Sequence, residues 1–171
     1  MIVAKTQRLI LSEVTLEDAD FFVELMNTPK WIKYIGDRKI SSENDAKQHL
    51  KKTILKCYKE HGFGFYKVCL KVDPLTIIGI CGLIKREELE DVDIGFGFLP
   101  AFEGNGYGYE SAITILKLAK EKFGIKRIAA ITLALNTDSI NLIQKLGMTF
   151  EKKVNPFEED EELLLFAKNL E

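Results

Sequence analysis

Apolar residues recur along the chain with two different spacings, and the alternation of these spacings predicts a mixed α and β fold. In the segment after Thr15, for example, Ala19, Phe22, Val23 and Met26 follow the i, i+3, i+4, i+7 pattern of a helix. Runs rich in β-branched and aromatic residues indicate strands. The helices expected from these patterns are 15–27, 42–61, 109–123 and 136–146. The expected strands are 8–14, 63–72, 76–85, 91–99, 128–135, 148–154 and 163–168.

The order of these elements favours one α+β domain over residues 1–171. The three strands between residues 63 and 99 are joined by short turns, one at Asp73-Pro74, and should form an antiparallel meander. The segment 128–135 is nearly continuously apolar, as is typical of a strand covered on both faces. We therefore expect a mixed, mostly antiparallel central sheet with helices on both faces. Residues 31–38 are expected to form a loop or a short helix.

Composition excludes several classes of protein. The 171 residues are 46% hydrophobic and 29% charged, which suits one globular domain. A balance of 24 Lys and Arg against 26 Asp and Glu provides no basic field for nucleic acid. No apolar run is long enough to span a bilayer, and the first residues lack a signal-peptide core, so we expect a cytoplasmic protein without a membrane partner. The spacing of Cys57, Cys69 and Cys81 argues against a metal site.

The most informative segment is the glycine-rich stretch 103–111, which follows a strand and precedes a helix. Glycines at 104, 106 and 108 allow backbone N–H groups to face a single point. The N-terminus of the next helix adds free N–H donors and positive potential. This arrangement predicts a site for phosphate or pyrophosphate, and the alternative is a flexible turn that binds nothing. A P-loop would need Gly-Lys-Ser/Thr, and a dinucleotide site an acid about 20 residues on, so a nucleotide-binding oxidoreductase is the weaker interpretation.

Several segments at consistent spacing resemble a known family. The stretch Gly-Asn-Gly-Tyr-Gly-Tyr-Glu-Ser at 104–111 resembles the acetyl-CoA loop of the GNAT superfamily of N-acetyltransferases. Residues 93–96, with Leu99-Pro100, resemble the fourth strand of the branch that includes bacterial ribosomal-protein N-terminal acetyltransferases. Residues 136–148 resemble that branch's Asn-x-x-Ser…Lys-x-Gly-Phe/Met pattern, and residues 6–11 resemble its first strand. The resemblance covers essentially the whole chain.

This resemblance implies transfer of an acetyl group from acetyl-CoA, as co-substrate, to a primary amine by direct attack in a ternary complex, without a metal. The amine would be a protein N-terminus, a polyamine or another small amine. Pantetheine would enter between the fourth strand and the strand 128–135, with backbone groups near Phe98 and Leu99 holding the thioester. The loop residues that would hold the pyrophosphate are Gly104, Asn105, Gly106, Tyr107, Gly108 and Tyr109.

The same resemblance suggests roles for several further residues. Asp93 would be the general base, acting through a water, and its alternative is a solvated or salt-bridged carboxylate. Ser139 would protonate or hydrogen-bond the leaving sulfur, or would only pack in the first turn of its helix. The Asn136 side chain would form a hydrogen bond with an amide of pantetheine, and could also cap the helix 136–146. Trp31 and Tyr34, together with Asp37 and Arg38, would line the acceptor pocket, or the aromatic residues would serve as packing anchors.

Some features depart from the family or leave alternatives open. Ile143 stands where many superfamily members carry a Tyr general acid, so that role has no matching residue here. Glu103 brings an acid near the pyrophosphate, and its side chain should point away. The acid-rich runs at 87–93 and 158–162 are solvated loops or a field that gathers cationic amines. A CoA-binding or sensing module without catalysis is the alternative function, and a homodimer is left open.

Overall fold

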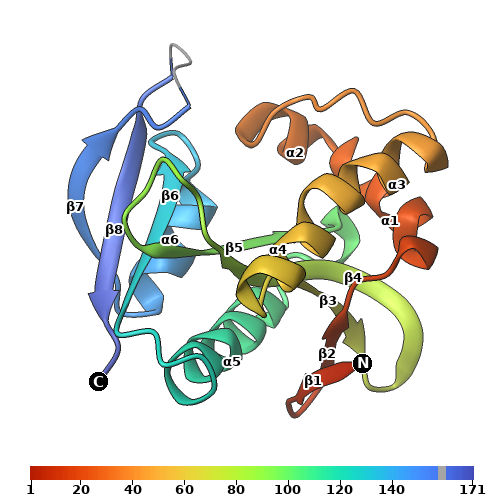
Figure 1. Cartoon of the computed structure of the whole chain (residues 1–171), viewed down its shortest axis with the longest axis horizontal. Coiled ribbons are helices and arrows are strands. Elements are labelled where there is room, and N and C mark those ends of the chain that lie inside the picture. The colour runs from red at the N-terminus through yellow and green to blue at the C-terminus, as the bar shows by residue number, and fades with distance from the viewer. Residues whose placement is uncertain (158–160) are drawn as a thin grey trace.

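The computed structural model describes residues 1–157 and 161–171, and these form one eight-stranded sheet flanked by helices (Figure 1). The strand order is β1-β2-β3-β4-β5-β6-β8-β7, and only β5 and β6 run parallel among the described pairs. The strands are β1 (Ile2–Lys5), β2 (Leu9–Glu13), β3 (Phe65–Leu70), β4 (Asp73–Ile84), β5 (Val92–Phe98), β6 (Arg127–Leu133), β7 (Thr149–Val154) and β8 (Leu163–Asn169). The helices are α1 (Ala19–Met26), α2 (Pro29–Tyr34), α3 (Glu43–Lys52), α4 (Ile54–His61), α5 (Tyr107–Glu121) and α6 (Thr137–Lys145), with 3-10 turns at Leu16–Asp18 and Pro100–Phe102.

The predicted mixed, mostly antiparallel sheet is confirmed, and three local expectations need correction. The single helix expected over 42–61 is two helices, α3 and α4. They are separated at Thr53, whose hydroxyl donates to the His49 carbonyl at 2.7 Å. Such a bond to the backbone four residues earlier bends helices. The turn expected at Asp73-Pro74 lies two residues earlier, at 71–72, and strand β1 was not anticipated. Of the acidic run 158–162, residues 158–160 lie outside the described residues.

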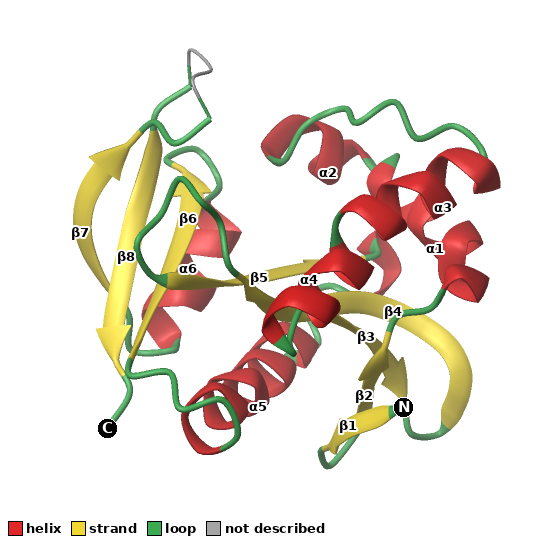
Figure 2. Ribbon diagram, in the orientation of Figure 1, coloured by secondary structure: helices red, strands yellow, loops and turns green. Residues whose placement is uncertain are grey.

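Each face of the sheet carries its own hydrophobic core (Figure 2). On one face Ile115 of α5 is buried against residues such as Leu83 of β4. On the other, Phe22 of α1 and Leu50 of α3 are buried in a cluster with Ile80 of β4. The two cores fix the sheet between α5 and the α1–α4 group. Among the described residues, no helix combines the length and the hydrophobicity that a membrane crossing requires.

The parallel pairing of β5 with β6 is short, and this positions the site. Their ladder contains the pairs Val92–Ile128 and Asp93–Ala129, and no further pair is found in the described part of the chain. Beyond them β5 stays bonded to β4 as far as Phe98, while β6 pairs with β8 along its whole length. The two strands therefore diverge like the arms of a V (Figure 1). One edge of β5 is left with unpaired backbone groups that need partners.

The two ends of β4 provide a test of this packing. Leu83 is fully buried, whereas Leu75 on the same strand is 94% exposed. Leu83→Ala should lower the free energy of unfolding by about 2–5 kcal/mol, because it removes core contacts and leaves a cavity. The control, Leu75→Ala, should change it by no more than about 0.5 kcal/mol. Urea unfolding followed by circular dichroism measures both, and equal losses would contradict the assignment of Leu83 to the core.

Candidate active site

A cavity of about 1890 Å³ opens where β5 and β6 diverge. Small-molecule sites are typically about 300–1,000 Å³, so this cavity has room for two substrates at once. Most of the predicted site residues line it. They are Trp31, Tyr34, Asp93, Phe98, Gly104, Gly106, Tyr107, Gly108, Asn136 and Ser139. Leu99, Asn105 and Tyr109, which are also described, are not among its lining residues.

Phe98 and Leu99, at the end of β5, direct their backbone groups to opposite edges of the strand. The Leu99 N–H donates to the Ile78 carbonyl of β4 at 2.9 Å, so it is already engaged within the sheet. Successive residues of a strand direct their backbone groups to opposite edges, which turns those of Phe96 and Phe98 toward β6. The Leu99 side chain is buried in the core beside α1. Phe98 is therefore the residue of the predicted pair whose backbone faces the divergence.

The glycine loop forms a concave backbone surface at the start of α5. Gly104 and Gly106 have φ angles of 77° and 81°, in the left-handed region that favours glycine. A Cβ added to Gly104 would meet no atom within 4 Å, so the space beside the loop is open. Gly106 is the N-cap of α5 and offers no side-chain cap, which leaves the N–H groups of the first turn free for a ligand. The arrangement suits a phosphate or pyrophosphate.

Arg8 of the β1–β2 connection supports the loop from one side, and its role was not predicted from the sequence. Its Nη1 donates to the Asn105 carbonyl at 2.9 Å, and its Nε donates to Oε1 of Glu110 at 2.9 Å. The guanidinium also lies 4.4 Å from the centre of the Tyr107 ring. Tyr109 is turned toward Lys145, whose Nζ lies 4.3 Å from the ring centre. Arg8 therefore fixes the loop by bonding to its backbone and to the helix that follows.

Lys30 of α2 supports the loop from another direction. Its Nζ donates to Oε2 of Glu103 at 2.6 Å and to Oδ2 of Asp138 at 3.0 Å. The hydrogen bond to Glu103, and to a smaller extent the one to Asp138, raises the pKa of Lys30 above its usual value. The bridge neutralises Glu103, the acid that the sequence places next to the predicted pyrophosphate. It also connects α2, the loop and the first turn of α6 around one end of the cavity.

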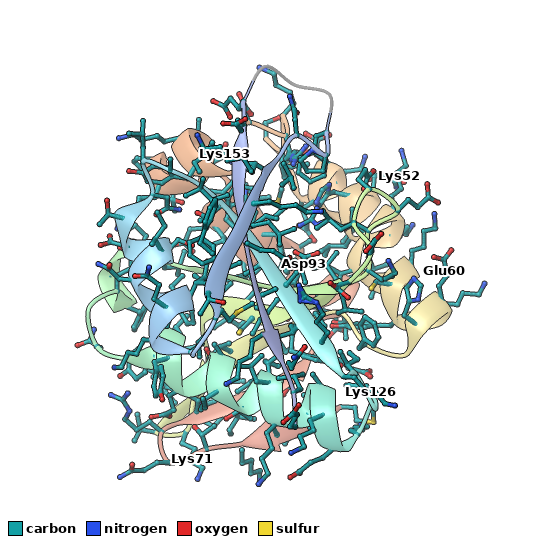
Figure 3. All side chains as sticks on the ribbon, turned by 90° about the vertical axis from the view of Figure 1, so that its left-hand side faces the viewer. Lys52, Glu60, Lys71, Asp93, Lys126 and Lys153 are labelled. Carbon is teal, nitrogen blue, oxygen red and sulfur yellow. The ribbon has the colours of Figure 1, made fainter. Side chains whose placement is uncertain are left out.

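Asp93 is the buried carboxylate of the site. Its side chain on β5 is nearly inaccessible, and Oδ1 accepts a hydrogen bond from Nε of Arg86 at 3.1 Å. Burial raises the pKa of Asp93 to about 6, against the lowering effect of the Arg86 charge. Figure 3 shows Asp93 in the interior, well away from the surface residues Lys52 and Lys153. A carboxyl group with this pKa can exchange a proton near neutral pH.

Asp91, the first residue of the expected strand 91–99, lies outside β5 and does not accompany Asp93 into the site. Strand β5 begins at Val92, so Asp91 precedes it. The Asp91 carboxylate lies 3.4 Å from Nε of Arg127 on β6. Arg86, the partner of Asp93, was also not singled out from the sequence. Its place seven residues before Asp93, across the β4–β5 turn, is the one local signal that could have indicated the pair.

Asn136 and Ser139, at the start of α6, both line the cavity, and Asn136 also caps the helix. Oδ1 of Asn136 accepts from the Ser139 N–H at 3.3 Å, so Asn136 caps the helix. The Ser139 hydroxyl lines the cavity and has no hydrogen-bond partner among the described residues. Ile143, one turn later, is buried and also lines the cavity. Ser139 is therefore the hydroxyl that α6 presents to the cavity.

Trp31 of α2 covers the face of β5 that faces the cavity. A Cβ added to Gly97 would lie 2.8 Å from Cζ3 of Trp31, so the indole packs directly on this glycine. The Trp31 Nε1 is buried and finds no acceptor in the described ranges. An unpaired buried N–H has a free-energy cost of about 1–3 kcal/mol, which a ligand oxygen could offset. Tyr34 lines the cavity beside it, with Nζ of Lys33 5.0 Å from its ring centre.

Comparison with known proteins identifies the family. Residues 8–149 match the model of the acetyltransferase (GNAT) domain. The chain belongs to this family. It is 27% identical to the uncharacterized N-acetyltransferase YnaD of Bacillus subtilis over 85% of this chain and 82% of that protein. This GNAT acetyltransferase therefore has the activity class that its motifs predicted.

Solved structures of the same fold agree. The ribosomal L7/L12 α-N-protein acetyltransferase RimL, solved in complex with coenzyme A, superposes with a TM-score of 0.84 at 15% identity, covering 99% of this chain and 98% of that one. An acetyltransferase from Agrobacterium tumefaciens gives a TM-score of 0.82 at 18% identity, covering 98% and 94%. At these identities the structures establish the fold, and they include members of the predicted ribosomal-protein branch.

The Asp93–Arg86 pair yields a direct prediction for the pKa of Asp93. In a carbon-13 NMR titration, the carboxyl signal that is lost in Asp93→Asn should titrate near pH 6. Arg86→Gln should raise that pKa further, because the carboxylate loses the nearby positive charge. The control Arg86→Lys retains the charge and should leave the pKa close to the wild-type value. Titration near pH 4, or no response to Arg86→Gln, would contradict the described environment.

Proposed function

We propose that this acetyltransferase moves the acetyl group of acetyl-CoA to a primary amine by direct attack in a ternary complex. The observation that carries the proposal is the placement, in one cavity, of an unpaired β5 edge, a glycine loop and a buried carboxylate. Acetyl-CoA supplies an activated thioester. The protein has to bind and orient the acceptor amine beside this thioester and remove a proton from it. Orientation of two bound substrates can account for a large part of the rate enhancement.

The residues present fit a CoA co-substrate. Backbone N–H groups of residues 104–108, at the N-terminus of α5, would hold the pyrophosphate, and the open space beside Gly104 leaves room for it. The backbone groups of Phe96 and Phe98 face the divergence of β5 and β6 and would pair with the amides of the pantetheine arm, as an added strand does. The Asn136 side chain retains its amide N–H donors beside them, because its oxygen caps α6.

Asp93 is the proposed general base, acting through a water. With a pKa of about 6 it is mostly ionised at neutral pH, yet it is more basic than an ordinary aspartate. A base works best when its pKa lies near the operating pH. The adjacent Arg86 guanidinium would stabilise the carboxylate and hold it in one orientation. These features support removal of a proton from the acceptor ammonium.

Ser139 is the proposed hydrogen-bond donor to the departing sulfur. Its hydroxyl has no hydrogen-bond partner among the described residues. Ser139 lies in the first turn of α6 and lines the same cavity. The position of the tyrosine acid of many superfamily members is held by Ile143, which cannot donate a proton. Trp31 and Tyr34 would contact the acceptor from the other wall of the cavity.

Ligand-induced thermal stabilisation tests the CoA site. Acetyl-CoA and CoA should raise the Tm of the wild type, whereas NAD should not, because a ligand stabilises the state that binds it. Gly106→Val should abolish the CoA-dependent shift, since a β-branched residue is strained at a φ of 81° and would displace the loop N–H groups. Gly124→Val is the control, because Gly124 also has a positive φ, 63°, but lies outside the site. This variant should retain the CoA-dependent increase in Tm. Stabilisation by NAD alone would refute the proposal.

Turnover tests the two proposed catalytic side chains. Thiol release from acetyl-CoA, measured across peptides, polyamines and aminoglycosides, should identify at least one accepted amine. Asp93→Asn should reduce kcat/KM for that amine by about 100-fold or more, the usual contribution of a general base. Ser139→Ala should reduce kcat, and both variants should bind CoA as the wild type does. Binding of CoA without turnover of any amine would favour a sensing module, and unchanged rates would remove the residue concerned from the mechanism.

A further inference from the structure

The wall of the cavity contributed by α3, α4 and the preceding loop is cationic. Its lining residues include the cations Arg38, Lys52 and Lys56, the imidazole of His49 and one carboxylate, Glu60. We call Arg38, His49, Lys52 and Lys56 the basic wall. Arg38 lies between α2 and α3, His49 and Lys52 belong to α3, and Lys56 belongs to α4. Figure 3 shows Lys52 and Glu60 at the outer edge of these helices, to one side of the interior Asp93. Residues from position 38 to position 56 therefore converge on one side of the cavity.

Two of these cations have no carboxylate partner among the described residues. Arg38 and Lys52 form no ion pair with any described residue, whereas Lys56 lies 3.8 Å from the Glu60 carboxylate. Burial lowers the pKa of His49, and the nearby Arg38 charge lowers it further, so the field of Arg38 reaches along this wall. By contrast, the cations near the glycine loop and Asp93 are matched, since Lys30 bonds to Glu103 and Arg86 bonds to Asp93.

The β4–β5 connection contributes charges of both signs to the cavity, and its cation Arg86 is paired with Asp93. Glu87 and Glu88 of the β4–β5 connection line the cavity together with Glu161, and we call these three residues the acidic rim. Glu87 and Glu88 have no ion-pair partner among residues 1–157 and 161–171. In Figure 1 the β4–β5 connection lies beside β6 and β8, at the end of β5 away from α2 and α3. The unpaired cations Arg38 and Lys52 and the unpaired acids Glu87 and Glu88 therefore line different parts of the cavity.

We propose that the acceptor is an amine that also carries an anionic group, a carboxylate or a phosphate. The inference rests on the proposed acetyl transfer and specifies its substrate class. The ammonium group would lie toward Asp93 and the acidic rim, and the anion would lie toward Arg38 and Lys52. A polycation would place like charge against the basic wall, and such juxtaposition discriminates against wrong partners.

Matched substrates provide the test. Three peptides of equal length begin with Ser and continue with Asp and Glu, with Asn and Gln, or with Lys and Arg. Free glutamate and spermidine complete the set, so that a peptide source and a small-molecule source of the anion are compared. The wild type should show a kcat/KM for the acidic peptide or for glutamate about tenfold or more above that for the neutral and basic amines, mainly through KM.

Charge reversal on the basic wall should remove this preference. The double variant Arg38→Glu, Lys52→Glu should lower kcat/KM for the anionic acceptor about tenfold and raise it for the Lys-Arg peptide, while KM for acetyl-CoA stays unchanged. The control Lys51→Glu, Lys59→Glu makes the same charge change on α3 and α4 at positions outside the cavity lining and should behave as the wild type. Fluorescence anisotropy of the labelled acidic peptide on the CoA-bound protein should show the same loss of binding.

The outcomes separate this inference from the proposed function. Turnover of the neutral peptide with no preference for the anionic acceptors, or equal effects of the two double variants, would overturn the inference and leave acetyl transfer standing. A raised KM for acetyl-CoA in the Arg38, Lys52 variant would assign the basic wall to the cofactor and would also overturn it. No transfer to any amine by a CoA-binding protein would overturn the proposed function, and the inference with it.

Discussion

The organisation of this protein depends on the early end of one parallel ladder. After the pairs Val92–Ile128 and Asp93–Ala129, β5 and β6 separate, and the β6-facing backbone groups of β5 lose their partners. Backbone N–H and C=O groups need hydrogen bonds, which is why we propose that a ligand pairs with this edge. The sheet can sustain it because α5 packs on one face and α1 and α3 pack on the other, while β8 pairs β6 throughout. The opening between the strands is therefore held by the core.

Ion pairs then set the chemistry around that opening. Arg8 and Lys30 fix the glycine loop from two directions, so its N–H groups can face a phosphate without reorganisation. Arg86 stands beside Asp93, where burial and a positive charge act in opposite directions and leave the carboxyl pKa near neutral pH. Arg8 and Lys30 thus hold the glycine loop in position, and Arg86 counteracts the effect of burial on the pKa of Asp93. Arg38 and Lys52 have no ion-pair partner in the part of the chain that the structure describes, and this is the basis for the proposal that the acceptor carries an anionic group.

Much of the fold and the centre of the site were predictable, because they depend on short-range patterns. The strand, glycine loop and helix around Gly106, the cap at Asn136 and the candidate base Asp93 each lie within a few residues of their signal. The contacts of Arg8 with Glu110 and of Lys30 with Asp138 join residues more than 100 positions apart, and no local pattern reveals them. The break at Thr53 depends on a single side-chain hydrogen bond. The engagement of the Leu99 N–H depends on strand register, which hydrophobic spacing does not specify.

Amide hydrogen exchange with and without CoA tests the central claim most directly, since it observes the backbone groups that the account assigns to the ligand. Addition of CoA should slow exchange at residues 104–108 and at Phe96 and Phe98. It should leave the exposed β3–β4 turn at residues 71–72 unchanged. Protection at both the loop and the strand edge is the predicted result. Unchanged exchange at the β5 edge in CoA-saturated protein would contradict the account, because the divergence of β5 and β6 would then have no role in binding.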